Sequence, residues 1–270
     1  MPFTNREGGE LRSLPLIYRL GRDFQVAETF CWRDPRDSDR VLSIPAHDLS
    51  LPPGEGNSTD FASVPPFLWG LIASFGKQTL SAILHDELAY RARLAPADQR
   101  LELRRTADED FRVSLIDSGM HQLRARVMWA SVSVERYVRH ARRLGAVIIA
   151  QLSLGVLAIV SSVALGIVAH PLWLLFGLAP AVAALPWGKN LNLLITSSYL
   201  GALYAPLVAT AFIGSRAEQL LAISIWAGTG TPGPVPKAEP TLRWPDRDTT
   251  PNAQRPPREG GTAVDMTSDN

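Results

Sequence analysis

The stretch that decides the fold is Leu144–Ala169, LGAVIIAQLSLGVLAIVSSVALGIVA, which runs for 26 residues without a formal charge. At a rise of 1.5 Å per residue, a helix of this length extends about 39 Å, more than the roughly 30 Å thickness of a bilayer's hydrocarbon core. A helix that faced water on any side would need more polar residues than this stretch contains. Leu144–Ala169 therefore predicts a membrane-spanning helix.

Two further apolar runs follow the first. Leu172–Trp187 is short for a span, so a thin or kinked helix competes with a re-entrant segment as its interpretation. Leu191–Gly214 is longer and uncharged, and Lys189 is the only formal charge within residues 144–214. These runs predict an integral membrane protein whose partner is the lipid bilayer, with two or three spans in residues 144–214.

A basic cluster precedes the first apolar run and indicates its orientation. By the positive-inside rule, that end of the helix stays in the cytoplasm, together with the domain before it. Lys189 favours a cytoplasmic loop between the second and third runs, which is consistent with three spans. The cluster consists of Arg136, Arg139, Arg142 and Arg143.

Composition excludes two classes of protein. The net charge is +1 and no basic stripe interleaved with aromatic residues occurs, so nucleic acid is not an expected partner. Cys31 is the only cysteine, which excludes an internal disulfide framework. After a possible amphipathic or interfacial helix at 215–228, residues 229–270 are rich in Pro and Gly and are expected to be disordered.

The polar region 1–143 predicts an α+β fold. Short apolar stretches separated by turn residues predict β-hairpins, and the spacing then becomes helical, so a β module precedes an α-helical bundle. The expected strands lie within 16–18, 24–32 and 41–44, and the expected helices within 67–75, 79–94, 97–118 and 120–144.

His85 and Asp86 interrupt an otherwise apolar helical stretch, and Asp108 lies on the next expected helix. If the two helices pack antiparallel, Asp108 can meet His85 and fix its tautomer, which leaves the other ring nitrogen to activate water. The alternative is that His85 is a hydrogen-bonded core residue. For Thr59 and Asp60 the simpler explanation is that they form the N-terminal cap of a helix that begins near Pro65.

Three separated motifs carry a resemblance to a known family. They are TDFASVP at Thr59–Pro65, AILHD at Ala82–Asp86 with Tyr90, and Ala107–Asp108 with Phe111 and Gly119. In this order they resemble domain-of-unknown-function family 1353, which occurs in phages and bacteria. The resemblance spans about residues 14–137 and implies no activity.

A second resemblance concerns the helix pair alone. A His-Asp pair followed by Tyr on one helix, with Asp and Phe on the next, is similar to the core of sn-2-specific phospholipases. The resemblance implies that His85 is the general base, Asp86 a ligand of a divalent cation such as calcium, and Asp108 the acid that orients His85. It also implies supporting roles for four residues, Tyr90, Thr59, Asp60 and Ser63.

Two hypotheses follow. In the first, the protein is a membrane-tethered, metal-assisted hydrolase that acts near the bilayer through His85 and Asp108. In the second, it is a non-catalytic membrane or phage-related accessory protein, in which His85, Asp86 and Asp108 form a structural polar network. An open cleft beside His85 favours the enzyme, and complete burial favours the network.

Overall fold

A computed structural model describes residues 2–18, 24–51, 58–59 and 76–230, together with positions 233 and 235. Its N-terminal part contains a three-stranded antiparallel sheet, ordered β1-β4-β5, and a separate antiparallel pair, β2-β3. The expected strand 24–32 is two strands, and the first strand was not predicted. The strands are β1 (Phe3–Asn5), β2 (Leu16–Tyr18), β3 (Phe24–Val26), β4 (Phe30–Arg33) and β5 (Val41–Ile44).

Three helices follow, α1 (Thr79–Leu94), α2 (Ala97–Asp117) and α3 (Gln122–His140). α1 ends where Ala95 turns extended before Pro96, as the residue before a proline prefers. α2 ends at Asp117, and the positive φ of Gly119, two residues further on, allows the amide of Met120 to donate to the carbonyl of Leu115. The predicted α+β order, strands first and helices after, is confirmed.

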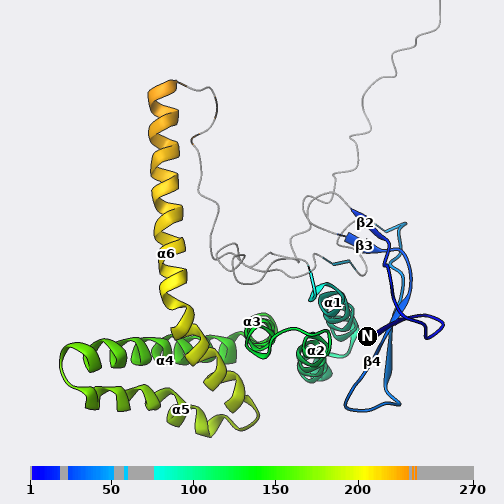
Figure 1. The fold of residues 1–270 in the computed structure, drawn as a ribbon, viewed down its shortest axis with the longest axis horizontal. Coiled ribbons are helices and arrows are strands. Elements are labelled where there is room, and N and C mark those ends of the chain that lie inside the picture. The colour runs from blue at the N-terminus through cyan, green and yellow to red at the C-terminus, as the bar shows by residue number, and fades with distance from the viewer. Residues whose placement is uncertain are drawn as a thin grey trace, which may run out of the picture.

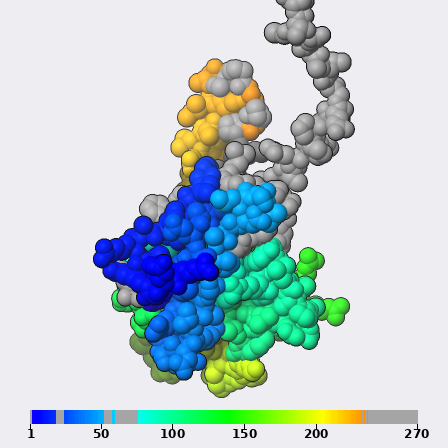
Figure 2. Space-filling model, turned by 90° about the vertical axis from the view of Figure 1, so that its right-hand side faces the viewer, coloured from blue at the N-terminus to red at the C-terminus, as the bar shows by residue number. Residues whose placement is uncertain are grey.

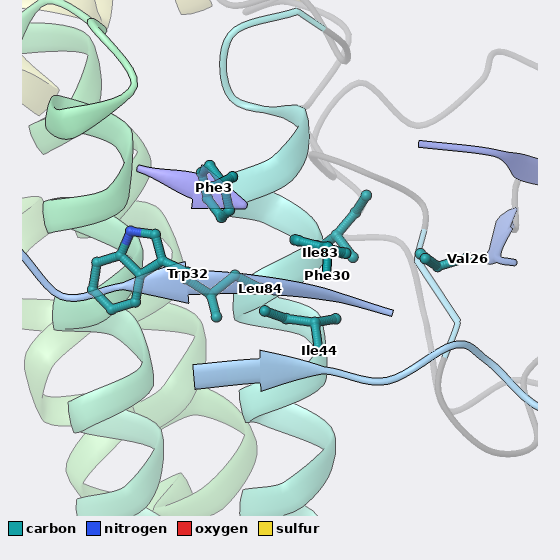
Figure 3. Close-up of a cluster of buried hydrophobic side chains, with 7 residues drawn as sticks. All are labelled: Phe3, Val26, Phe30, Trp32, Ile44, Ile83 and Leu84. Atoms are coloured by element: carbon teal, nitrogen blue, oxygen red, sulfur yellow. The ribbon is translucent and has the colours of Figure 1, made fainter. Parts of the chain in front are cut away.

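The sheet packs on α1 (Figure 3). Phe30 and Trp32 alternate with the less buried Cys31 along β4, so one face of the strand points to the helix. Ile83 and Leu84 of α1 meet that face, and both are fully buried. Burying each of these large side chains contributes about 1.5–3 kcal/mol, and the cluster fixes α1 against the strands.

Two long helices carry the apolar part, α4 (Arg142–Val168) and α6 (Leu191–Thr229). By length and composition, the stretches 142–168 and 171–229 can each cross a membrane. α3 ends at His140 rather than continuing to 144, because Ala141 leaves the helical conformation and α4 starts directly after it.

Between α4 and α6 the chain forms a 3₁₀ helix η2 (Pro171–Leu178), α5 (Ala179–Ala184) and a second 3₁₀ helix η3 (Leu185–Asn190). This segment runs back along α4 as a hairpin (Figure 1). Ser162 donates to the carbonyl of Trp173 at 3.0 Å, and Gln151 donates to that of Ala183 at 2.9 Å. Because a 3₁₀ helix rises about 2 Å per residue and an α-helix about 1.5 Å, the segment reaches further than its residue count suggests.

α6 is a single helix of 39 residues and includes the region 215–228 that was expected to be separate. Its first half packs inward, where Leu193 and Leu194 share a buried cluster with Trp129 of α3 and Ile148 of α4. The helix contains Pro206 and bends along its length (Figure 1), as expected where a proline removes a backbone hydrogen bond. Its C-terminal end projects from the body (Figure 2).

Candidate functional site

His85 and Asp108 meet between α1 and α2. Nε2 of His85 lies 2.8 Å from Oδ1 of Asp108, as expected for antiparallel packing of the two helices. Both residues are buried, with His85 5% exposed and Asp108 fully enclosed. The ring of Phe111 lies 4.9 Å from the imidazole, centroid to centroid, and covers it.

A third helix closes the other side of Asp108. Its Oδ2 accepts a hydrogen bond from Arg136 and a weaker one, at 3.4 Å, from the hydroxyl of Ser133. Arg136 and Ser133 both lie on α3 and are buried. One carboxylate therefore joins α1, α2 and α3.

The second ring nitrogen of His85 faces Asp86. Nδ1 lies 3.9 Å from Oδ1 of Asp86, and Oδ2 of Asp86 accepts a 2.7 Å hydrogen bond from Thr59. Thr59 is itself held by two backbone hydrogen bonds with Phe24, of 2.7 and 2.9 Å. The imidazole thus lies between two carboxylates, and Thr59 links the cluster to β3.

The surroundings of His85 favour its protonated form. Burial lowers the pKa of His85, but the hydrogen bond to Asp108 and the nearby carboxylate of Asp86 outweigh burial and raise this pKa above its ordinary value of 6.5. A raised pKa suits an imidazolium in an ion network better than a general base, which must be neutral to accept a proton.

Of the remaining predicted site residues the structure describes only Tyr90, which forms no hydrogen bond or ion pair with His85, Asp86 or Asp108. Tyr90 is half-buried and stacks with Arg93, whose guanidinium lies 5.2 Å from the ring centroid. Asp60, Ser63 and the predicted helix 67–75 lie outside the described residues.

The divalent cation predicted at Asp86 has no described ligand set. Among residues 2–18, 24–51, 58–59 and 76–230, no three His, Cys, Asp or Glu side chains gather in a way that could hold a metal ion. The cation therefore stays a prediction.

Two arginines of the cluster were missed in the sequence. Arg136 was assigned to the basic cluster before the membrane, yet its side chain points inward to Asp108. Arg104 is 6% exposed, and its charge acts on both His85 and His140. The spacing of these residues was the available signal. If α2 and α3 pack antiparallel so that Asp108 meets Arg136, then Arg104, one helical turn before Asp108, lies at the level of His140.

The fold and cluster thus define an α+β domain with a buried ion network, followed by long apolar helices. Residues 25–132 match the family model described as "Protein of unknown function (DUF1353)", and this segment is a domain of that family. The match includes His85, Asp86 and Asp108 but ends before Ser133 and Arg136. No curated protein and no solved structure matches the chain.

Proposed function

We propose that this protein is an integral membrane protein whose α+β domain is a non-catalytic accessory domain on the cytoplasmic side of the bilayer. The observation that carries the non-catalytic role is the enclosure of His85 between Asp86 and Asp108. The observation that carries the anchor is the exposed apolar surface of α4 and α6, which lipid can cover without cost.

Exposed side chains support the anchor. Leu154, Leu157 and Ile167 on α4 are 67%, 62% and 79% exposed in the isolated chain, and Ile213 and Leu220 on α6 are 65% and 67% exposed. Contiguous apolar patches of this kind are rare on proteins that face water. The full chain should sediment with membranes and resist extraction by alkaline carbonate, and recovery in the supernatant without detergent would refute the anchor.

Topology is the next part of the proposal. The return segment 171–190 ends at the domain, where Arg105 donates to the carbonyl of Lys189 at 2.9 Å. We therefore place Lys189 on the cytoplasmic side with the domain, and His170, in the bend after α4, on the opposite side.

Labelling with a membrane-impermeant maleimide tests this placement in a Cys31→Ser background. Lys189→Cys should react only in inside-out vesicles and His170→Cys only in right-side-out vesicles. Reaction of both cysteines from one side would show that the α4 hairpin enters the bilayer without crossing it.

The buried network supports a structural role for His85. Asp108 already has Arg136 as its counter-ion, so the cluster satisfies the carboxylate without a substrate. A buried polar network rigidifies a fold through its paired members, as the carboxylate of Asp108 is paired here with His85 and Arg136. The purified full chain should hydrolyse no member of a phospholipid and ester panel, with or without millimolar calcium.

A hydrolase is the second candidate, and one observation favours it. Asp108 binds Nε2 of His85, which leaves Nδ1 directed at Asp86, the residue that the phospholipase resemblance assigns to calcium. In that mechanism neutral His85 takes a proton from water while the resulting hydroxide attacks an ester carbonyl. When the C–O bond to the alcohol group breaks, the imidazolium returns this proton to the leaving alkoxide, which departs as the alcohol.

Calcium-dependent ester hydrolysis that is lost in His85→Gln and in Asp86→Asn would establish the second candidate. This conclusion requires both variants to melt within a few degrees of the wild type, so that the loss of activity does not come from unfolding. Activity that survives both substitutions would arise from a contaminant.

A further inference from the structure

Arg104 is a buried cation without an ion-pair partner among the described residues. It is 6% exposed, its Nε has no hydrogen-bond partner, and in the described part of the chain no carboxylate forms an ion pair with it. The Nε of Arg136 is also buried and without a partner. Leaving a buried charge uncompensated costs several kcal/mol, so a fold retains one where something else supplies the opposite charge.

The charges around His85 show what is missing. Of the buried carboxylates in the described residues, Asp34 and Asp110 pair with Arg36 and Arg40, and Glu87 pairs with Arg91. The other two, Asp86 and Asp108, lie with three basic groups, His85, Arg104 and Arg136. Asp108 pairs with both Arg136 and His85, and Asp86 faces His85. Both carboxylates therefore have basic partners, and neither of them forms an ion pair with Arg104. When His85 carries its proton, the cluster lacks one negative charge.

The residues next to Arg104 and Arg136 contact the start of the apolar helices. Its neighbour Arg105 donates to the carbonyl of Lys189, and Tyr137, the neighbour of Arg136, donates to Asn190 at 2.6 Å. Both contacts lie at the turn that leads from the return segment into α6. The residues that follow the two buried arginines in the sequence thus contact the junction between the domain and the apolar helices, so Arg104 and Arg136 are carried by the turns of α2 and α3 that reach this junction.

We propose that Arg104, assisted by Arg136, binds a phosphate group at this junction. A guanidinium presents donors in a planar fork that matches the oxygens of a phosphate, and pairs of arginines recur where phosphate is recognised. The junction offers the phosphate of an anionic phospholipid as the source, and free inorganic phosphate has the same chemistry. This inference goes beyond the proposed function and does not depend on whether the domain is catalytic.

Thermal unfolding of the full chain in a neutral maltoside detergent tests the site. One arm adds millimolar inorganic phosphate at constant ionic strength, and the other adds short-chain phosphatidylglycerol. Binding to the native state should raise the melting temperature by about 2–4 °C near saturation. A response to the lipid alone assigns the site to lipid phosphate, and a response to both assigns it to phosphate in general.

Variants separate the site from a general effect of charge. Arg104→Met should abolish the response and should melt at or above the wild-type temperature without phosphate, because it removes an unpaired buried charge. Arg124→Gln removes the same charge from an exposed position on α3 and should keep the full response. If Arg104→Met does not fold, Arg104→Lys, which keeps the charge but loses the fork, should respond more weakly than Arg124→Lys.

Two outcomes would overturn the proposal. In the first, the wild-type chain shows no shift with either inorganic phosphate or phosphatidylglycerol. In the second, Arg104→Met responds as strongly as the wild type, which would place any phosphate effect elsewhere on the protein.

Discussion

Oδ1 of Asp108 lies 2.8 Å from Nε2 of His85, although the two residues are 23 positions apart. The short connection through Ala95 and Pro96 turns α2 back along α1, so positions equally distant from the turn face each other. His85 therefore joins two helices through a hydrogen bond that is closed to water, and its contribution can be measured.

Replacing His85 should destabilise the domain. His85→Ala leaves Oδ1 of Asp108 buried without this partner, and breaking a buried pair in this way costs about 3 kcal/mol. His85→Gln keeps a donor near Asp108 and should lose less. Thermal unfolding of the full chain in detergent measures both effects.

His140→Ala is the matched control, because His140 is exposed and lies outside the pair. It should change the free energy of unfolding by less than about 0.5 kcal/mol. An equally small effect of His85→Ala would mean that the imidazole contributes nothing to stability, and the network interpretation would be abandoned.

The contribution of His85 should depend on pH. Its folded-state pKa is raised above 6.5, so its stabilising effect is fully present below pH 6.5 and is lost as the pH rises through the folded-state pKa. The difference in unfolding free energy between wild type and His85→Gln should therefore shrink as the pH is raised from 6.5 through the folded-state pKa of His85. A difference that grows over this range would show that the folded protein prefers neutral His85.

The sequence predicts the bounds of the domain's helices better than it predicts where their charged side chains lie. α1 matches the expected 79–94 because an apolar run ends at a proline, and α2 matches to within a residue for similar reasons. Arg136 was misread because a basic residue before a membrane helix fits the positive-inside pattern equally well. Only the packing of α3 on α2 reveals that this side chain points inward.

The strands and the return segment were harder to predict. β1 lies in a polar stretch whose three residues acquire a strand only by pairing with β4, a contact between distant positions. The segment 171–190 counts as short for a span at the rise of an α-helix, and its 3₁₀ geometry lengthens it. The composition of a short stretch shows neither which distant strand it will pair with nor whether its helix will be α or 3₁₀.

A second ion cluster should hold the β4–β5 turn to α2. Asp110 is 1% exposed and accepts hydrogen bonds from Arg36 and, at 2.6 and 2.9 Å, from Arg40. Asp110→Asn removes the charge that both arginines share with Asp34, and it should lower the unfolding free energy by about 1–3 kcal/mol. The arginines are partly exposed, so water screens part of the loss.

Glu109→Gln provides the control for Asp110→Asn. Glu109 is the preceding residue and pairs with Arg112 at the surface, where an ion pair contributes little. Chemical denaturation should place this variant within about 0.5 kcal/mol of the wild type. If the two substitutions lowered the unfolding free energy equally, the ion pairs of Asp110 would contribute no more stability than a surface ion pair.

The apolar helices should depend on close packing at Gly155. A Cβ at this position of α4 would lie 2.7 Å from Oγ and 3.1 Å from Cβ of Ser198 on α6, and 3.3 Å from Cβ of Pro180. Small residues let helices approach in this way within membranes, where dispersion contacts replace the hydrophobic effect. Gly155→Ala should therefore lower the melting temperature in detergent, with an overpacking cost of about 1–3 kcal/mol.

Two further variants make the Gly155 prediction specific. Gly214→Ala places a Cβ on α6 where nothing lies within 4 Å, so it should be neutral or slightly stabilising through helix propensity. Ser198→Ala removes the nearest clashing atom and should restore part of the stability lost in Gly155→Ala, since the two positions are in contact and their effects do not add. Strict additivity of these two substitutions would show that α4 and α6 do not approach each other at this point.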